Sequence, residues 1–134
     1  MADRSVDLFT AIYSALDGNA ALTALIGEHR VFDTPKAGLA PPYVVIGDET
    51  ANDFGSSAGD AQEHTITVHT WSEKPSTLQC KQIMSAIRVA LHTVALSLSG
   101  GSLVNLRQEF KETFRDPDGV SHHGVQRFRA LTEN

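Results

Sequence analysis

Apolar residues recur every three or four positions over residues 5–17, a spacing typical of an amphipathic helix. They form one stripe, which consists of Val6, Phe9, Ile12, Tyr13 and Leu16. Asp3 or Ser5 is suited to begin this helix, and Gly18 to end it, because glycine easily takes the left-handed backbone of a helix C-terminus. A shorter apolar pattern runs from Asn19 to Gly27. The first 27 residues therefore predict a hairpin of two helices.

The pattern then changes to extended segments. Residues 34–42 hold three prolines and a glycine, which is typical of a loop. Residues 43–47, an aromatic and β-branched run, predict a buried strand, and the alternation of residues 62–71 predicts a second one. Helical spacing returns from Pro75 to about Ala95. Residues 103–115 and 122–132, on either side of an Asp-Pro-Asp-Gly turn, predict a final pair of strands.

The predicted order of elements is α-α-β-β-α-β-β. We expect an α+β fold in which an antiparallel four-stranded sheet has helices packed on one face. At 134 residues the chain is expected to form a single domain. Residues 48–61 lose all periodicity and are rich in Gly, Ser, Asn and Asp, so they predict a flexible loop.

The last two predicted strands differ in the regularity of their alternation. In residues 103–115 we expect one face to carry the apolar positions Val104, Leu106, Phe110 and Phe114. The other face is expected to carry Asn105, Arg107, Glu109, Lys111 and Thr113. Alternation is imperfect in residues 122–132, which predicts a bulge there.

Composition excludes several classes of protein. Hydrophobic residues make up 41% and charged residues 20% of the chain, as in globular proteins. A net charge of −5 argues against a dedicated nucleic-acid binder, which normally carries a basic excess. The single cysteine, Cys80, excludes an intrachain disulfide and fits a reducing cytoplasm. No signal peptide and no apolar stretch long enough to span a bilayer is visible, so we expect a soluble intracellular protein without a membrane partner.

Candidate catalytic and metal-binding motifs are weak. Residues 55–59 match G-x-S-x-G, but the serine lacks the buried strand before it and the helix after it that a hydrolase requires. Asp116 and Asp118 are too few ligands for calcium and fit the turn instead. Cys80 has no histidine one helical turn away, which favours a buried structural thiol.

Histidine is the remaining candidate for a metal site. The six histidines are His29, His64, His69, His92, His122 and His123. His64 and His69 have opposite parity on one strand, and the adjacent His122 and His123 also diverge. Only His64 with His122 or His123 is expected to meet across strands, too few ligands for zinc. We therefore predict no catalytic residue, no cofactor-binding residue and no metal site.

Charged side chains on the predicted strands are more informative. Arg107, Glu109, Lys111 and Arg115 lie on the third strand, and Arg127 and Arg129 lie on the last. They fit either a solvated sheet face with cross-strand ion pairs or a polar surface that docks another protein. A nucleic-acid module would instead need the four arginines to form one continuous stripe. The candidate partner-contact residues are Asp53, Phe54, Arg107, Lys111, Arg115, Arg127 and Arg129.

Several segments in a fixed order resemble a known family. They are LTALIG at residues 22–27, RVFD at 30–33, PYVVIG at 42–47, the strand end Trp71-Ser72, DPDG at 116–119 and GVQRFRA at 124–130. With the leading helix that ends in Leu16-Asp17, they resemble the phage tail completion or tail terminator family. That family includes proteins of siphophages, prophages and gene transfer agents.

The resemblance implies a structural role without catalysis or cofactor. Such a protein forms a ring, commonly a hexamer, that caps the head-proximal end of a tail tube, stops tube growth and joins the tail to the head or neck. Its implied partners are copies of itself, the tail tube protein and the head–tail connector. DNA would pass through the ring without specific binding. The implied location is the bacterial host cytoplasm during assembly and then the particle's tail–neck junction. The alternative is a small ligand-binding or enzymatic domain, with the Gly/Ser loop as a lid and His64 with His122 or His123 as site groups.

Overall fold

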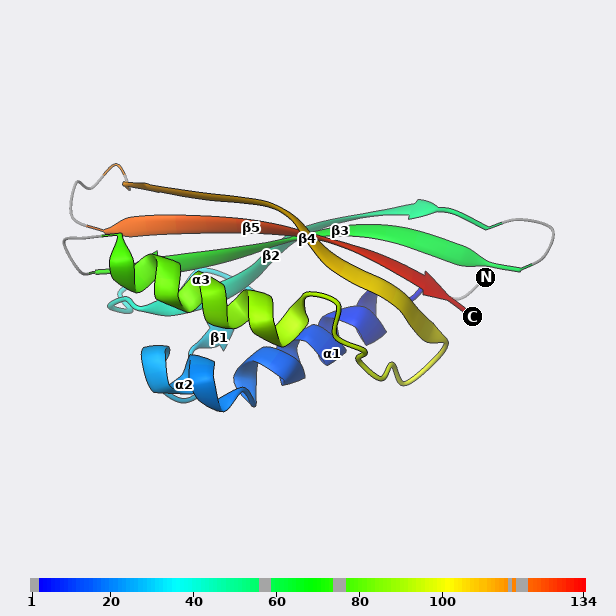
Figure 1. Cartoon of the computed structure of the whole chain (residues 1–134), viewed down its shortest axis with the longest axis horizontal. Helices are drawn as coiled ribbons and strands as arrows, with labels where there is room; N and C mark the ends of the chain where they lie inside the picture. The colour runs from blue at the N-terminus through cyan, green and yellow to red at the C-terminus, as the bar shows by residue number, and fades with distance from the viewer. Residues whose placement is uncertain (1–2, 56–58, 74–76, 116, 118–120) are drawn as a thin grey trace.

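The structure, a computed structural model, describes residues 3–55, 59–73, 77–115, 117 and 121–134. The helices are α1 (Ser5–Asp17), α2 (Ala20–Ile26) and α3 (Leu78–Leu91). The strands are β1 (Val31–Phe32), β2 (Tyr43–Asp53), β3 (Ala61–Ser72), β4 (Ser102–Arg115) and β5 (His122–Glu133). Figure 1 shows a strongly twisted sheet with all three helices on one of its faces.

The five strands form one sheet in the order β1-β2-β3-β5-β4. The four long strands pair antiparallel, as predicted, and β1 pairs parallel with β2. The α+β class is therefore confirmed, whereas the predicted number of four strands is one too few. The additional strand is short: only Val31 and Phe32 pair, with Val44 and Val45.

The hydrophobic core lies between the helices and the sheet. Its fully buried side chains come from α1 (Leu8, Ile12, Leu16), α3 (Ile83, Ile87, Leu91) and the sheet (Ile66, Val68, Phe128). The predicted stripe of α1 was out of phase at its start, because Val6 is 75% exposed and Leu8 is buried in its place. Asn19 is the N-cap of α2, since its side-chain oxygen accepts a hydrogen bond from the Leu22 backbone N–H at 2.9 Å.

Glycine ends both N-terminal helices, but in two conformations. Gly27 after α2 has a φ of +93°, the conformation that favours glycine. Gly18 after α1 has a φ of −90°, so the left-handed conformation predicted there is wrong. Its N–H still reaches back to the Ser14 carbonyl oxygen at 3.0 Å, which continues the helical hydrogen bonding for one more residue.

Two strand predictions are corrected. Residues 48–53, predicted as part of a loop, continue β2 and pair with β3 from Glu49↔Ile66 to Asp53↔Gln62. The burial pattern gives no sign of this strand, because of the seven β2 residues after Ile46 only Gly47 and Glu49 are half-buried and the others are exposed. The bulge predicted in residues 122–132 is wrong, because β5 alternates regularly; the register shifts fall instead in the neighbouring strand β4, at 103/105 and 108/110.

The second shift in β4 also reverses its parity. Leu106 is buried against the core, whereas Phe110 and Phe114 are 40% and 37% exposed. Because a bulge inserts one extra residue into a strand, side chains beyond it change faces. The expectation that Val104, Leu106, Phe110 and Phe114 share one face is therefore wrong. Phe110 and Phe114 belong to the face opposite the helices, called here the helix-free face.

Candidate partner-binding surface

The helix-free face carries a row of rings that crosses four strands. The strand register places Tyr43 of β2 opposite Trp71 of β3, Trp71 opposite His123 of β5, and His123 opposite Phe114 of β4. The successive ring centroids are 5.4, 4.2 and 4.8 Å apart. Cross-strand ring contacts of this kind stabilise a sheet. We call these four side chains the ring row.

A second histidine joins the ring row from the side. His69 stacks on Trp71 with centroids 5.5 Å apart, and its Nδ1 lies 2.9 Å from Nε2 of His123. One of the two nitrogens must donate and the other accept, so at least one imidazole is neutral. Burial lowers the pKa of His69, and the carboxylate of Asp48 partly opposes this effect. Gly47 leaves room for the imidazole, since a Cβ there would be 2.8 Å from the His69 ring.

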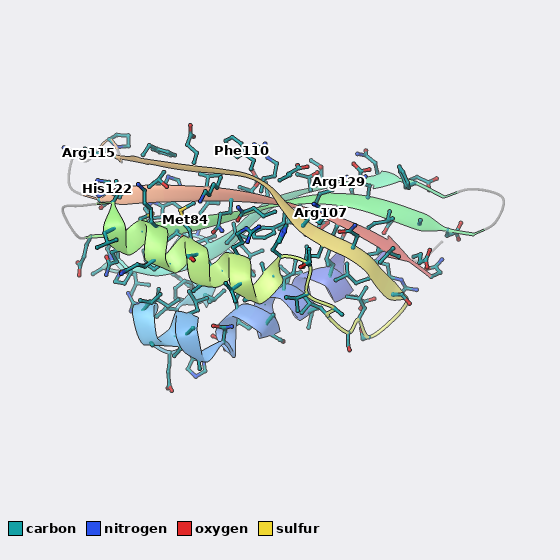
Figure 2. The ribbon with its side chains drawn as sticks, viewed as in Figure 1. Met84, Arg107, Phe110, Arg115, His122 and Arg129 are labelled. Atoms are coloured by element: carbon teal, nitrogen blue, oxygen red, sulfur yellow. The ribbon has the colours of Figure 1, made fainter. Side chains whose placement is uncertain are left out.

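Arginines lie beside these rings on the same face. Arg107 of β4 is directly opposite Arg129 of β5, and Arg129 donates to Glu63 Oε2 at 2.7 Å. That hydrogen bond holds the pKa of the Glu63 carboxyl below its ordinary value. The guanidinium of Arg127 lies over the Phe110 ring at 4.7 Å, a cation–π contact. Figure 2 shows Phe110 on the side of β4 that faces away from α3, and Met84 between α3 and the sheet.

The seven predicted contact residues do not form one patch. Arg107, Arg127 and Arg129 are near one another on the helix-free face. Lys111 lies on the helix side, where it lines a groove between α3 and β4. The other three lie at the ends of the sheet. Arg115 is opposite His122 beside the β4–β5 connection. Asp53 is the last residue of β2 and Phe54 follows it, and this end of β2 lies at the other end of the molecule (Figure 1).

The continuous stripe of four arginines that a nucleic-acid module would need is therefore not formed. Arg115 is separated from the other three by half the length of β4 and by the reversed parity beyond the bulge. Glu63 further neutralises Arg129. This arrangement does not provide the continuous basic surface of a nucleic-acid-binding module.

The histidine pair proposed as a site in the alternative prediction does not form. His64 is buried on the helix side, with Nε2 2.9 Å from Thr132 Oγ1 and Nδ1 3.5 Å from Glu49. It is paired with Ala130, at the opposite end of β3 from the residues that pair with His122 and His123. The divergence of His64 from His69, and of His122 from His123, is confirmed by their opposite burial.

The other candidate chemistry gives no site in the described residues. Across these residues no group of three or more His, Cys, Asp or Glu side chains is placed to hold a metal ion. Cys80 is a buried free thiol, as predicted, and burial raises its pKa. Residues 56–58 of the G-x-S-x-G match, and Asp116 and Asp118, lie outside the described residues. None of the helices, where the structure describes them, is both long and apolar enough to cross a bilayer.

Comparison with known proteins decides the family. Residues 10–133 match the family of tail completion protein gp17. The chain belongs to this family. The tail completion protein gp17 of Bacillus phage SPP1 is 26% identical over 106 residues, which are 79% of this chain and 78% of the phage protein. The family resemblance read from the sequence is thus confirmed.

Two solved structures share the fold. A chain in the virion of a native gene transfer agent particle superimposes with a TM-score of 0.91 at 27% identity, over the full length of both chains. The structure of bacteriophage SPP1 gp17 gives a TM-score of 0.65 at 27% identity, over 97% of this chain and 91% of that one. The relatives are structural tail completion proteins, so this family member is a structural protein of a virion-type particle and not an enzyme.

Sequence reasoning missed the ring row of this tail completion protein. Its members lie on four separate strands, and only the strand register brings them together. Alternation alone does place Trp71 and His69 on one face of β3, which was the available signal. That Tyr43 and His123 lie opposite Trp71 follows only from the pairing of β2 and β5 with β3, which the alternation does not give.

Proposed function

We propose that this tail completion protein forms a ring of six subunits on the head-proximal end of a tail tube. The ring ends polymerisation of the tube and supplies the surface to which the head or neck attaches. The observation that carries the proposal is the full-length superposition on a chain of a gene transfer agent virion, together with the gp17 family match. Such a protein acts through its surfaces, and a helix-free sheet face bearing rings and arginines offers one.

The partners of this ring are copies of the same chain, the tail tube protein and the head–tail connector. A closed ring uses heterologous contacts, in which one patch of a subunit meets a different patch of the next. DNA passes through the channel without sequence-specific contacts, in keeping with the net charge of −5 and with the interrupted arginines. Assembly takes place in the cytoplasm of the bacterial host, and the finished ring stays at the tail–neck junction.

The test is deletion of the gene in a strain that produces the particles, followed by electron microscopy of the tails. We expect tubes that exceed the normal length and heads that carry no tail, because nothing stops growth or joins the two parts. A plasmid copy of the wild-type gene is the control and should restore both. Tails of normal length attached to heads in the deletion strain would refute the proposal.

A further inference from the structure

At each of the two edges of the sheet, part of the edge strand has no neighbouring strand among the described residues. β1 pairs only with Val44 and Val45, so in the described chain residues 46–53 of β2 pair with β3 alone. At the opposite edge of the sheet, residues 92–93 form hydrogen bonds with the edge of β4 at two points. The Thr93 N–H donates to the Leu106 carbonyl oxygen at 2.8 Å, and the Gln108 N–H to His92 Nδ1 at 2.9 Å.

Residues 110–115 of β4 lie beyond that cover. Within the described residues their backbone pairs with β5 and with no other segment. An exposed strand edge of this kind is a template for pairing with another chain. A protein that keeps two such edges, one on each side of the same sheet, has the two different patches that a heterologous contact needs.

The two free edges differ in charge. Residues 46–53 carry Asp48, Glu49 and Asp53 and no basic residue, whereas residues 110–115 carry Lys111 and Arg115 against Glu112. Two copies of the acidic edge would repel each other, and so would two copies of the basic one. Charge therefore favours the contact between unlike edges, which propagates from copy to copy, over a twofold contact between like edges.

Side-chain parity selects one register for that contact. Glu49 lies on the helix side of β2, near the buried His64, and Asp53 has the same parity because it pairs with Gln62. On β4 the helix-side residues beyond the bulge include Lys111 and Thr113, since Thr113 contacts Met84 of α3.

One antiparallel alignment then places Lys111 opposite Asp53 and Arg115 opposite Glu49 of the next copy. The same alignment places Phe110 opposite Phe54. These two rings are 40% and 55% exposed, among the most exposed large hydrophobic side chains in the described chain. A shift by two residues in either direction loses the ring pair and at least one of the two ion pairs.

The alignment also satisfies the geometry of a closed ring. Within one chain, Thr113 pairs with Gly124, Gly124 with Thr70, and Thr70 with Val44, so these residues lie at the same height across the sheet. In the proposed contact Thr113 would pair with Ala51 of the next copy, and Ala51 pairs with His64 of its own β3. The displacement along β3 from Thr70 to His64 is six residues, or about 20 Å. Four strand spacings separate equivalent strands by about 19 Å. The strands would therefore tilt by about 45° from the ring axis, at the upper end of the range for closed barrels.

We propose that neighbouring copies join edge to edge, with residues 110–115 of β4 added antiparallel to residues 49–54 of the next copy, in the register Lys111–Asp53, Arg115–Glu49 and Phe110–Phe54. The proposal rests on the ring of the proposed function and identifies how its subunits meet. Three helices on one face need more room than the side chains on the other, so ring closure places the helices outside and the helix-free face toward the channel.

Cross-linking in assembled particles tests the register. The variant F54C/F110C is expressed in the deletion strain, and purified particles are treated with a short bis-maleimide and separated by denaturing electrophoresis. We expect a ladder of covalent multimers of this protein. The matched control is F54C/V104C, which moves the second thiol six residues along β4, about 20 Å from the predicted contact. The native Cys80 is buried and present in both.

Charge reversal tests the ion pair independently of the cross-link. K111E and D53K each place like charges in contact, so we expect at least a tenfold loss of functional particles in the deletion strain. K111E/D53K restores opposite charges in every contact of the ring and should recover at least a third of the wild-type yield. Thermal unfolding of each purified variant checks the fold, since both side chains are exposed.

The outcomes separate this proposal from the function on which it rests. A ladder in F54C/F110C but not in the control, with recovery in the double reversal, supports the register. No ladder in the predicted pair, or an equal ladder in the control pair, overturns it even where deletion lengthens the tails. Single reversals with wild-type yield overturn the Lys111–Asp53 contact. Tails of normal length in the deletion strain refute the proposed tube capping. The cross-linking result in F54C/F110C is independent of tail length, so it still tests the edge contact between copies.

Discussion

Gly124 is a position at which side chains of helix α3 lie close against the sheet. A Cβ at this residue of β5 would lie 2.4 Å from Sδ of Met84, 2.9 Å from Sγ of Cys80 and 3.1 Å from Cγ of Met84. Ordinary contacts between such atoms are about 3.5–4.0 Å. The Gly124→Ala variant therefore has to displace side chains on two successive turns of α3.

The displacement meets resistance at both contacts. Cys80 is fully buried and has a short side chain, so its sulfur moves only with the helix. The helix is tied to the sheet at this point, because the Gln126 side-chain amide donates to the Met84 carbonyl oxygen at 2.9 Å. Overpacking of this kind costs about 1–3 kcal/mol. It exceeds the roughly 0.4–1 kcal/mol by which Gly→Ala stabilises a strain-free site through the unfolded chain.

Urea denaturation followed by circular dichroism measures this effect. We expect Gly124→Ala to lower the free energy of unfolding by about 1–2 kcal/mol after that offset, and the Tm by about 3–8 °C. In a Cys80→Ala background the same change should cost at least about 0.5 kcal/mol less, because contacting residues are energetically coupled. A Gly124→Ala variant as stable as the wild type in both backgrounds would refute the close approach of α3 to β5.

Two further predictions concern the two faces of the sheet. Because burial holds the pKa of His69 below its unfolded value of about 6.5, the unfolded state binds the proton more readily. Neutral His69 therefore contributes fully to the free energy of unfolding above pH 6.5, and this contribution falls as the pH is lowered through that value. A His69→Phe variant whose melting temperature shows the same acid dependence as that of the wild type would contradict this. Phe128 is fully buried in the central strand pair, so Phe128→Ala should lower the free energy of unfolding by about 3–5 kcal/mol, measured by denaturant titration, whereas a loss below 1 kcal/mol would show that the core is not closed around this ring.

The elements with strong periodicity were predictable from the sequence. Apolar spacing located all three helices, and the alternation of β3 and β5 located both central strands to within one residue of their observed ends. These segments have one buried face, so burial itself imposes the pattern. Helix α3 ends earlier than predicted, at Leu91 in place of about Ala95, because its apolar stripe runs on into the segment that follows it. The predicted start at residues 75–76 lies outside the described residues.

The edge strands were less predictable for a physical reason. Both β2 and β4 lie beside solvent for part of their length, so their residues are exposed on two sides and lose the alternation that burial imposes. Bulges add to this effect, since each one inverts the parity of all later residues. For this reason the alternation in the sequence predicts the wrong faces for Phe110 and Lys111, and the composition of residues 48–53 predicts a loop where β2 continues.

The surfaces of this protein also explain why a search for short motifs finds no functional site. A catalytic centre draws on a few residues whose chemistry restricts their identity, whereas the ring row takes one side chain from each of four strands, from Tyr43 of β2 to Phe114 of β4. Each of these positions alone is an ordinary outward-facing residue of a half-buried strand. The row exists because the register of β2, β3, β5 and β4 aligns them, and that register is fixed by the opposite, buried face. The core therefore does more than stabilise the fold: it sets which outward side chains become neighbours, and so determines the surface through which a structural protein acts.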